Sequence, residues 1–311
     1  MTRPARIRMI DASDQVADLW RARPPALPIE VHRGDPDRAA LMEMMGDADV
    51  ILNGHTYLDA DAIAAGKDLR GIVFLGSGAA SYIDMEAAAA QGVPVRTISN
   101  YGDAAVAQHT LALVLDAVRH VSRMDRDIRR GSWQTLEGRE FGEMRLGVIG
   151  LGGIGRSFAA LAARVGFEVL AWNRSPVQPP EGVRMATLEE VLKTADIVSI
   201  HLNYGPQTAG FIDADRIARM RRGAILVNTA RAGLVDTQAM LAALDAGRLG
   251  HAALDVFDHE PLDPASPLAR REDVTLTAHA GFKTGSATRR LLDRAVEEAR
   301  ALLAEAGLQA T

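Results

Sequence analysis

Cysteine is absent from this sequence of 311 residues. The chain therefore forms no disulfide, has no thiolate nucleophile, and cannot bind zinc or an iron–sulfur cluster through cysteine. Lysine is scarce: the three lysines are Lys67, Lys193 and Lys283, and none of them ends the glycine-rich pattern of a phosphate-binding loop. These absences exclude a Walker-type NTPase and a disulfide-stabilised secreted scaffold, and we expect no metal site.

Long apolar runs and basic blocks are missing as well. No run reaches the roughly 18 apolar residues of a membrane-spanning helix, and the amino-terminal segment lacks the apolar core of a secretory signal. The net charge of -5 is spread along the chain, so the electrostatic footprint that nucleic-acid binding requires is absent. We expect a cytoplasmic protein that binds neither membranes nor nucleic acids.

The length of the chain is about twice the roughly 150 residues of a typical domain, so we expect two domains. In the first hundred residues, short apolar runs alternate with amphipathic stretches, which predicts a parallel α/β sheet. The runs predicted as strands are ARIRMI (5–10), LPIEV (27–31), ADVILN (48–53), LRGIVFL (69–75) and VPVRTI (93–98).

A second α/β series begins near residue 145. Its apolar runs are nearly continuous, as in strands that are buried on both faces. They are LGVIG (146–150), EVLAWN (168–173), DIVSIHLN (196–203), AILVNTAR (224–231), AALDVF (252–257) and VTLTAH (274–279). Apolar periodicity also predicts one long helix over 103–122, and a last amphipathic helix over 285–306 that packs on the first domain.

The segment GLGGIG at 150–155 matches the G-x-G-x-x-G fingerprint of dinucleotide binding, between a predicted strand and a predicted helix. In this pattern Gly150 makes the tight turn, Gly152 lets a pyrophosphate approach the backbone, and Gly155 lets the helix pack on the strand. The anion would lie at the helix N-terminus. The alternative is a tight turn that binds no ligand.

The second strand of this series ends at Asn173, Arg174 and Ser175, where dinucleotide-binding proteins specific for NAD carry an acidic residue. A carboxylate there would accept hydrogen bonds from the ribose 2′-hydroxyl and repel a 2′-phosphate. Its absence favours NADP(H) over NAD(H). NAD(H) remains open, with Asn173 binding the ribose diol and Arg174 a solvated charge.

Polar residues follow several of the predicted strands, at the sheet edge where parallel sheets bind ligands. Arg231, Glu260 and His279 are among them. Arginine can bind a carboxylate and polarise a carbonyl, histidine can deliver a proton, and a carboxylate beside the histidine stabilises its protonated form. The set is sufficient for hydride transfer to a 2-oxo acid, with the cofactor carrying the hydride.

These segments carry a family resemblance. The glycine fingerprint, VNTARAGLVD, ALDVFDHEPL and TAHAG occur in the order and approximate spacing of the D-isomer-specific 2-hydroxyacid dehydrogenases, which the chain resembles over nearly its whole length. The resemblance implies an α/β fold of two Rossmann-like or flavodoxin-like parallel-sheet domains with an active-site cleft between them. Residues 1–100 plus 281–311 would form the substrate-binding domain, residues 101–280 the dinucleotide-binding Rossmann domain, and two copies a homodimer.

Residue roles follow from the same resemblance. Arg231 would bind the substrate, His279 would be the acid/base that also contacts it, and Glu260 would be the partner of His279. The backbone amides of Ser77, Gly78 and Ala79 would bind the substrate carboxylate, and Asp255 the nicotinamide carboxamide. The remaining cofactor-binding residues are expected to be Gly150, Gly152, Gly153, Ile154, Gly155, Asn173, Arg174, Ser175, His201, Thr229, Ala230 and Gly281.

Some positions depart from the family pattern. Ala278 stands where a proline usually precedes the catalytic histidine, and AGFKTG follows in place of the commoner isoleucine–glycine pair. The aromatic side chains of His55, Tyr57, Tyr82 and Tyr101 are candidates either for substrate contacts or for ordinary packing.

The leading functional hypothesis is an NADPH-dependent reductase of glyoxylate, hydroxypyruvate or a similar small 2-oxo acid, giving the D-2-hydroxy acid. Oxidation of the D-3-phosphoglycerate dehydrogenase kind is one alternative. A nucleotide-sensing protein similar to the corepressor branch of the family is another, although Arg231, Glu260 and His279 are all present and argue against it.

Overall fold

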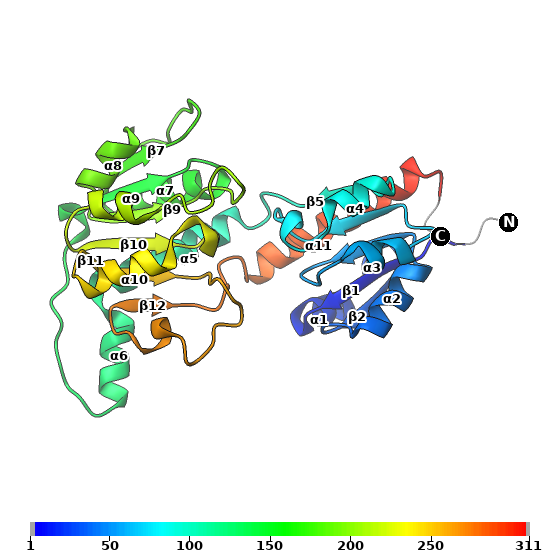
Figure 1. The fold of residues 1–311 in the computed structure, drawn as a ribbon, viewed down its shortest axis with the longest axis horizontal. Coiled ribbons are helices and arrows are strands. Elements are labelled where there is room, and N and C mark those ends of the chain that lie inside the picture. The colour runs from blue at the N-terminus through cyan, green and yellow to red at the C-terminus, as the bar shows by residue number, and fades with distance from the viewer. Residues whose placement is uncertain (1–3, 309–311) are drawn as a thin grey trace. The chain divides into compact units, whose positions relative to one another are not determined.

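The computed structural model describes residues 4–308, so the outermost residues of the predicted substrate-binding domain, 1–3 and 309–311, lie outside the described residues. The chain folds into two compact units (Figure 1). One contains the residues up to Tyr101 together with those from Thr284 onward. The other is Gly102–Lys283.

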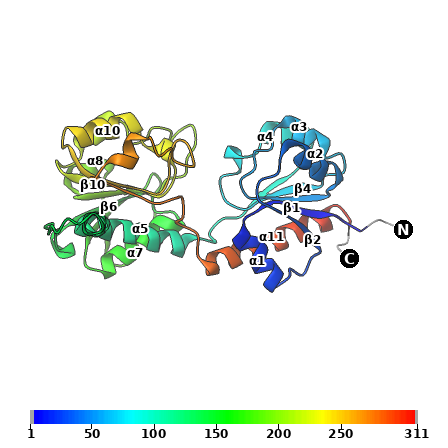
Figure 2. The ribbon, with the colours of Figure 1, turned by 90° about the horizontal axis from the view of Figure 1, so that it is seen from below.

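The first unit is built on a parallel five-stranded sheet in the order β2-β1-β3-β4-β5, the flavodoxin-like order. Helices cover both faces, with α2, α3 and α4 on one side and α1 and α11 on the other (Figure 2). The strands are β1 (Ile7–Ala12), β2 (Ile29–Arg33), β3 (Val50–Asn53), β4 (Gly71–Phe74) and β5 (Val95–Thr97), and the helices α1 (Asp14–Ala22), α2 (Arg38–Asp47), α3 (Ala60–Ala65), α4 (Met85–Ala90) and α11 (Gly285–Glu305).

Helix α11 returns from the end of the chain to pack on this sheet, as its amphipathic pattern predicts. Leu291, Ala295 and Leu302 are buried in one cluster with side chains of β1 and β3. The helix lies so close to β4 that a Cβ on Gly71 would be 2.6 Å from Leu302 Cδ1. A larger residue at this strand position would force the Leu302 side chain to move.

The second unit contains a parallel sheet in the order β12-β11-β10-β9-β6-β7-β8, a Rossmann arrangement with one further strand beside β11. These two sheets confirm the predicted fold class. The strands are β6 (Arg145–Ile149), β7 (Glu168–Trp172), β8 (Val183–Met185), β9 (Ile197–Ile200), β10 (Ala224–Asn228), β11 (Leu249–Leu254) and β12 (Val274–Leu276), and the helices α5 (Asp103–Arg119), α6 (Val121–Arg129), α7 (Gly153–Arg164), α8 (Leu188–Thr194), α9 (Ala214–Arg219) and α10 (Thr237–Asp245).

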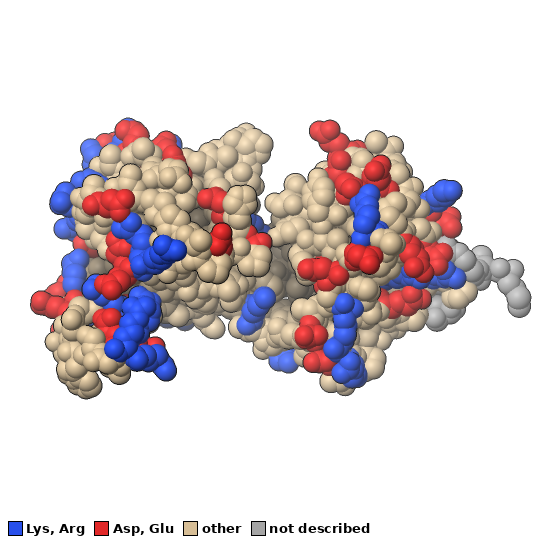
Figure 3. Space-filling model, turned by 60° about the horizontal axis from the view of Figure 1, so that its bottom comes forward, with Lys and Arg blue, Asp and Glu red and all other residues tan. Residues whose placement is uncertain are grey.

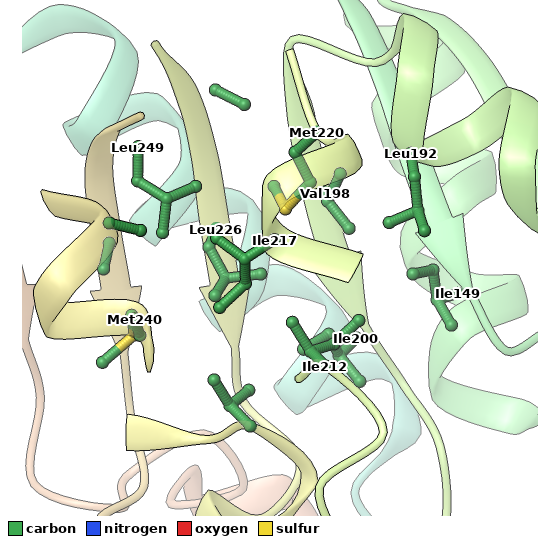
Figure 4. Packing of buried hydrophobic residues seen from close by; sticks show 14 of the residues in the cluster. Ile149, Leu192, Val198, Ile200, Ile212, Ile217, Met220, Leu226, Met240 and Leu249 are labelled. Carbon is green, nitrogen blue, oxygen red and sulfur yellow. The ribbon is translucent and has the colours of Figure 1, made fainter. Parts of the chain in front are cut away.

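The core of this unit fills both faces of the sheet. Figure 4 shows the face covered by α8, α9 and α10, where Ile149, Val198 and Leu226 of the strands lie among Ile217 and Met240 of the helices. Helices α5 and α7 cover the opposite face (Figure 2). Because both faces are buried, the strands are apolar along nearly their whole length.

The long helix predicted over 103–122 is wrong at its C-terminal end. Helix α5 ends at Arg119, and a separate helix, α6, follows. His120 between them has a left-handed backbone (φ 55, ψ 34) that breaks the ladder of helical hydrogen bonds. Asp116 accepts hydrogen bonds from the Ser122 amide at 2.6 Å and its hydroxyl at 2.8 Å, which fixes the start of α6.

Eight helices begin at an Asp, Ser or Thr whose side chain accepts a hydrogen bond from the amide three residues later. These caps are Ser13, Asp37, Asp59, Asp84, Thr187, Asp213, Asp236 and Thr284. Helices α5, α6 and α7 begin at Gly102, His120 and Gly152 with no such cap. The missing cap of α7 bears on the site described below.

Surface charge is mixed on the face drawn in Figure 3, where arginine and lysine side chains alternate with acidic ones. Within residues 4–308, no helix is long and apolar enough to cross a membrane. The same residues contain no group of three or more His, Asp or Glu side chains placed to hold a metal ion.

Candidate active site

The glycine turn between β6 and α7 is closed tightly by backbone contacts. Gly150 has φ +98, and a Cβ there would lie 2.6 Å from the carbonyl oxygen of His201. A Cβ on Gly155 would lie 2.0 Å from the carbonyl oxygen of Gly150. Neither position has space for a Cβ, and Gly150 also has a backbone conformation that favours glycine.

The mouth of the same turn is open. Apart from Gly152 itself and its two chain neighbours, no atom of residues 4–308 lies within 4 Å of the position that a Cβ on Gly152 would take. This residue begins α7 without a capping side chain. A helix N-terminus of this kind attracts anions through its amides and its dipole. The turn fits a dinucleotide pyrophosphate. Asp103 borders it, because a Cβ on Gly153 would lie 1.9 Å from Asp103 Oδ2.

The end of β7 carries the three residues expected to read the adenosine ribose. Asn173 Oδ1 accepts a hydrogen bond from the Leu151 amide at 3.0 Å, and Asn173 Nδ2 donates to the Ser175 carbonyl at 2.8 Å. Asn173 therefore ties this strand end to the glycine turn. Arg174 is exposed and donates to Gln207 Oε1 at 3.0 Å, so its guanidinium lies at the surface.

The ends of β9 and β10 place further predicted cofactor residues on the same sheet edge. His201 Nε2 lies 2.9 Å from Ser199 Oγ, and burial lowers the pKa of His201 to about 3, so the ring is neutral near pH 7. Thr229 is buried with its hydroxyl 2.8 Å from that of Thr110. The Ala230 amide donates to Asn228 Oδ1 at 3.0 Å.

Arg231 follows β10 in an extended conformation (φ -148, ψ 142). The Asn228 side chain spans this turn, because its Nδ2 donates to the Arg231 carbonyl at 2.9 Å. Arg231 Nη1 donates to the carbonyl oxygen of Ala230 at 2.7 Å. Within residues 4–308, this is the one hydrogen bond that the Arg231 guanidinium donates.

Glu260 and His279 form the central pair of the site. They come from the segments after β11 and β12, which are neighbours in the sheet, and His279 Nδ1 lies 2.6 Å from Glu260 Oε2. The Phe257 amide donates to Glu260 Oε1 at 3.0 Å, which orients the carboxylate toward the ring. Each side chain is about one-third exposed, at 32%. The other ring nitrogen, Nε2, has no hydrogen-bond partner among the residues that the structure describes.

Asp255 lies buried at the end of β11 and accepts hydrogen bonds from the segment that carries His279. Its Oδ1 accepts from the Ala280 amide and the Thr277 hydroxyl, at 2.9 and 2.6 Å. Its Oδ2 accepts from the Gly281 amide at 2.9 Å. Burial acts to raise the pKa of Asp255, but hydrogen bonds from His109, Thr277 and the two amides outweigh it, so the pKa is lowered.

The sequence patterns did not identify His109 and Thr277 as members of this network. His109 Nε2 lies 2.9 Å from Thr277 Oγ1 and 3.2 Å from Asp255 Oδ1. In the sequence, this network is indicated only by the polar residue His109 within the apolar pattern of α5. The expected contact of Asp255 with the nicotinamide carboxamide stays a prediction, because the carboxylate already accepts several hydrogen bonds from the chain.

In the first unit, the predicted substrate loop follows β4. The amides of Ser77, Gly78 and Ala79 donate no hydrogen bond to any part of the chain that the structure describes. Ala79 begins a short 3-10 helix, Ala79–Ser81. Unpaired successive amides can bind a carboxylate.

A second feature of this unit escaped the sequence patterns. Asp11, at the end of β1, is buried and accepts hydrogen bonds from the amides of Gly54, His55 and Thr56, at 2.8, 2.6 and 2.8 Å. It holds the loop after β3, where the candidate aromatic residues His55 and Tyr57 lie. Strands β1 and β3 flank the switch point of the flavodoxin-like order, where such sheets bind ligands.

Comparisons with known proteins agree with this architecture. Hydroxypyruvate reductase of Thermotoga maritima is 31% identical over 277 residues, which cover 87% of this chain and 90% of that protein. D-3-phosphoglycerate dehydrogenase of Mycobacterium tuberculosis is 36% identical over 275 residues, 86% of this chain but 52% of that protein. The chain therefore spans about half the length of the phosphoglycerate dehydrogenases it matches.

A solved structure and a family match also agree with this architecture. The crystal structure of the TT0316 protein from Thermus thermophilus superposes on this chain with a TM-score of 0.86 at 33% sequence identity, covering 98% of both chains. Residues 111–281 match the family described as D-isomer specific 2-hydroxyacid dehydrogenase, NAD binding domain. The chain belongs to the D-isomer specific 2-hydroxyacid dehydrogenase family.

Proposed function

We propose that this protein reduces a small 2-oxo acid of the glyoxylate or hydroxypyruvate kind to the D-2-hydroxy acid, with NADPH as the favoured cofactor. The observation that carries the proposal is the 2.6 Å contact between His279 Nδ1 and Glu260 Oε2. Glu260 follows β11, which lies in the sheet between β12, the strand before His279, and β10, the strand that leads to Arg231. An oriented histidine–carboxylate pair beside an arginine is the minimum that proton delivery to a bound oxo acid requires.

The three side chains divide the chemistry among them. When bound, the reduced cofactor supplies the hydride that adds to the carbonyl carbon. Arg231 binds the substrate carboxylate and polarises the carbonyl through its planar guanidinium. His279 gives a proton to the carbonyl oxygen as that oxygen becomes a hydroxyl. Glu260 holds His279 through Nδ1, so that the other ring nitrogen faces the substrate, and stabilises the protonated ring.

The cofactor would be held by the unit Gly102–Lys283. The open position at Gly152 and the uncapped start of α7 support a pyrophosphate there. NADPH is favoured because the end of β7 carries Arg174 and no acidic residue beside it. A cell that keeps its NADPH pool reduced would run the reaction toward the hydroxy acid.

In the other unit, the amides of Ser77, Gly78 and Ala79 would bind the substrate carboxylate. Unpaired amides at this loop support the assignment, since a carboxylate would give them acceptors. A homodimer is part of the proposal, on the resemblance to the family.

The experiment is a panel of 2-oxo acids, each tested with NADPH and with NADH by following the absorbance of the reduced nicotinamide. We expect turnover with glyoxylate or hydroxypyruvate and a lower KM for NADPH than for NADH. Chiral chromatography of the glycerate formed from hydroxypyruvate should show the D enantiomer, whereas the glycolate formed from glyoxylate is achiral. Tight binding of NADPH without turnover on any member of the panel would contradict an enzyme and favour a nucleotide-sensing protein.

Oxidation of D-3-phosphoglycerate is the second candidate, because the phosphoglycerate dehydrogenase of Mycobacterium tuberculosis is 36% identical over the matched 275 residues. The same assay run in reverse, with D-3-phosphoglycerate and oxidised cofactor, separates the two. The 2-hydroxy acids that correspond to the panel are oxidised in the same reverse assay, and a higher kcat/KM for D-3-phosphoglycerate than for any of them would replace the first proposal with the second.

A further inference from the structure

A cavity lies behind the segment that carries Glu260, entirely within the unit Gly102–Lys283. It has a volume of about 220 Å³ and lies between α10 and the chain that follows β11. Its lining includes Met240 and Leu241 of α10, and Phe257, Asp258 and Asp263 of the chain after β11. Neither the hydride-transfer chemistry nor the proposed cofactor contacts use it.

The interior of the cavity is apolar, because Met240, Leu254, Val256 and Leu268 are all buried core residues. An apolar cavity of about 150 Å³ in another protein is large enough for benzene. The present volume is above that size and below the roughly 300 Å³ at which drug-sized sites begin. One aromatic ring or one branched aliphatic group with a short substituent fits.

The margin of the cavity is acidic. Asp258 and Asp263 line it, and the lining contains no lysine or arginine. Asp258 Oδ2 accepts a hydrogen bond from the Thr237 hydroxyl at 2.7 Å, and Asp263 Oδ1 accepts from the Ala265 amide at 2.8 Å. The other oxygen of each carboxylate has no hydrogen-bond partner among residues 4–308, so each can accept from a cationic group.

Two walls of the cavity are also supports of the active site. Phe257 lines it, and the Phe257 amide is the donor that orients Glu260. Asn228 lines it too, and its side chain fixes the turn that carries Arg231. An occupant that displaces the Phe257 ring would shift the hydrogen bond to Glu260.

We infer that this cavity is a binding site for a small primary amine with one aromatic ring or branched aliphatic group. The apolar body fills the space between Met240 and Phe257, and the ammonium group lies at Asp258 and Asp263. Occupancy changes the environment of the Phe257 amide and thereby the orientation of Glu260. Binding at the cavity is independent of the proposed 2-oxo acid reduction, and only its effect on turnover rests on that function.

Benzylamine is the probe, with benzyl alcohol as its neutral analogue of nearly the same shape. Binding is measured on the full chain by NMR, from the methionine methyl signal of Met240 and the amide signal of Phe257. We expect a saturable shift of both signals with benzylamine and at least fivefold weaker binding of benzyl alcohol. No saturable shift at Met240 would overturn the site, and equal affinity for the two probes would overturn the assignment to amines.

The charge requirement is tested with the double variant Asp258→Asn and Asp263→Asn, which changes only exposed side chains. We expect its affinity for benzylamine to fall at least fivefold and its affinity for benzyl alcohol to stay unchanged. Asp125→Asn, on the exposed helix α6, is the matched control for the loss of a surface carboxylate. Equal benzylamine affinity in the double variant and in the wild type would contradict the proposal.

The location is tested with Leu241→Trp, which adds volume at a partly exposed position of the lining. We expect this variant to lose the benzylamine shift at Met240. If it does not fold, the double aspartate variant still decides the matter. None of these binding measurements requires enzymatic turnover. A lack of activity with the 2-oxo acids would therefore not affect the test of the cavity, and a lack of benzylamine binding would not affect the proposed function.

Discussion

The backbone amide of His279 donates to the carbonyl oxygen of Asp255 at 2.9 Å, and the next two amides donate to the Asp255 carboxylate. Three successive amides are thus held by one residue. His279 needs such support because its backbone is left-handed, with φ 48, a conformation that costs energy in any residue with a Cβ. Asp255 is a positioning residue for the histidine, whatever contact it also makes with a cofactor.

Asp255→Asn replaces one acceptor oxygen by an amide that faces hydrogen-bond donors. We expect it to lower the free energy of unfolding by about 1–3 kcal/mol, the usual cost of leaving buried polar groups unpaired, and to lower kcat more than it raises KM for the cofactor. Urea unfolding and steady-state kinetics measure the two effects. A variant that loses only cofactor affinity would show that Asp255 acts on the nicotinamide and not on His279.

Gly152→Ala and Gly155→Ala are a matched pair in the glycine turn. We expect Gly155→Ala to destabilise the protein by about 1–3 kcal/mol or more, because its Cβ would meet the Gly150 carbonyl oxygen at 2.0 Å. Gly152→Ala has free space around its Cβ, so the protein should unfold at the wild-type temperature but bind NADPH much more weakly. Wild-type NADPH affinity in Gly152→Ala would place the pyrophosphate elsewhere.

Arg174→Ala tests cofactor choice. Hydrogen bonds to charged groups contribute about 1.5–3 kcal/mol, so loss of a contact with the 2′-phosphate should raise KM for NADPH by about tenfold or more, with little change for NADH. The comparison is made with the same 2-oxo acid under saturating conditions. If KM rises equally for both cofactors, Arg174 does not read the phosphate.

His251 makes stability depend on pH. Burial lowers the pKa of its imidazole from 6.5 to about 4 in the folded protein, so between these values the unfolded chain binds the extra proton. The neutral His251 ring therefore contributes fully to the free energy of unfolding above pH 6.5. As the pH falls from 6.5 toward 4, the free energy of unfolding decreases by up to about 1.4 kcal/mol per pH unit.

The comparison variant is His251→Gln, whose amide can keep the hydrogen bond to Thr275 Oγ1, which lies 2.9 Å from His251 Nε2. Urea unfolding at neutral and at mildly acidic pH should show a shallower loss of stability in the variant than in the wild type. A constant difference between the two proteins across that range would show that His251 is not the titrating group.

All strands of the two sheets except β8 were predictable, mainly because buried strands of parallel sheets leave nearly continuous apolar runs. The same logic brought Arg231, Glu260 and His279 together as candidates, since each follows a strand at one sheet edge. Strand β8 was missed because it has three residues, of which only Val183 is buried. A strand of this length is too short to show an alternation of apolar and polar residues.

Other features depend on backbone conformations that have no sequence signal. The left-handed turn at His120 separates α5 from α6 inside an apolar pattern that predicts one helix. The network of Asp255 with His109 and Thr277 joins three distant segments, and depends on the left-handed turn at His279. Asp11 likewise reaches a loop more than forty positions away.

The activity of the variant His279→Asn is the most direct test of the proposal that His279 donates the proton to the substrate. Asparagine is the replacement of choice because it tolerates the left-handed backbone at this position. His120→Asn, at the other left-handed histidine of residues 4–308, is the control. We predict that His279→Asn lowers kcat for 2-oxo acid reduction by about a hundredfold or more while NADPH binding and His120→Asn activity stay at wild-type values. Wild-type turnover in His279→Asn would contradict the assignment of His279 as the proton donor.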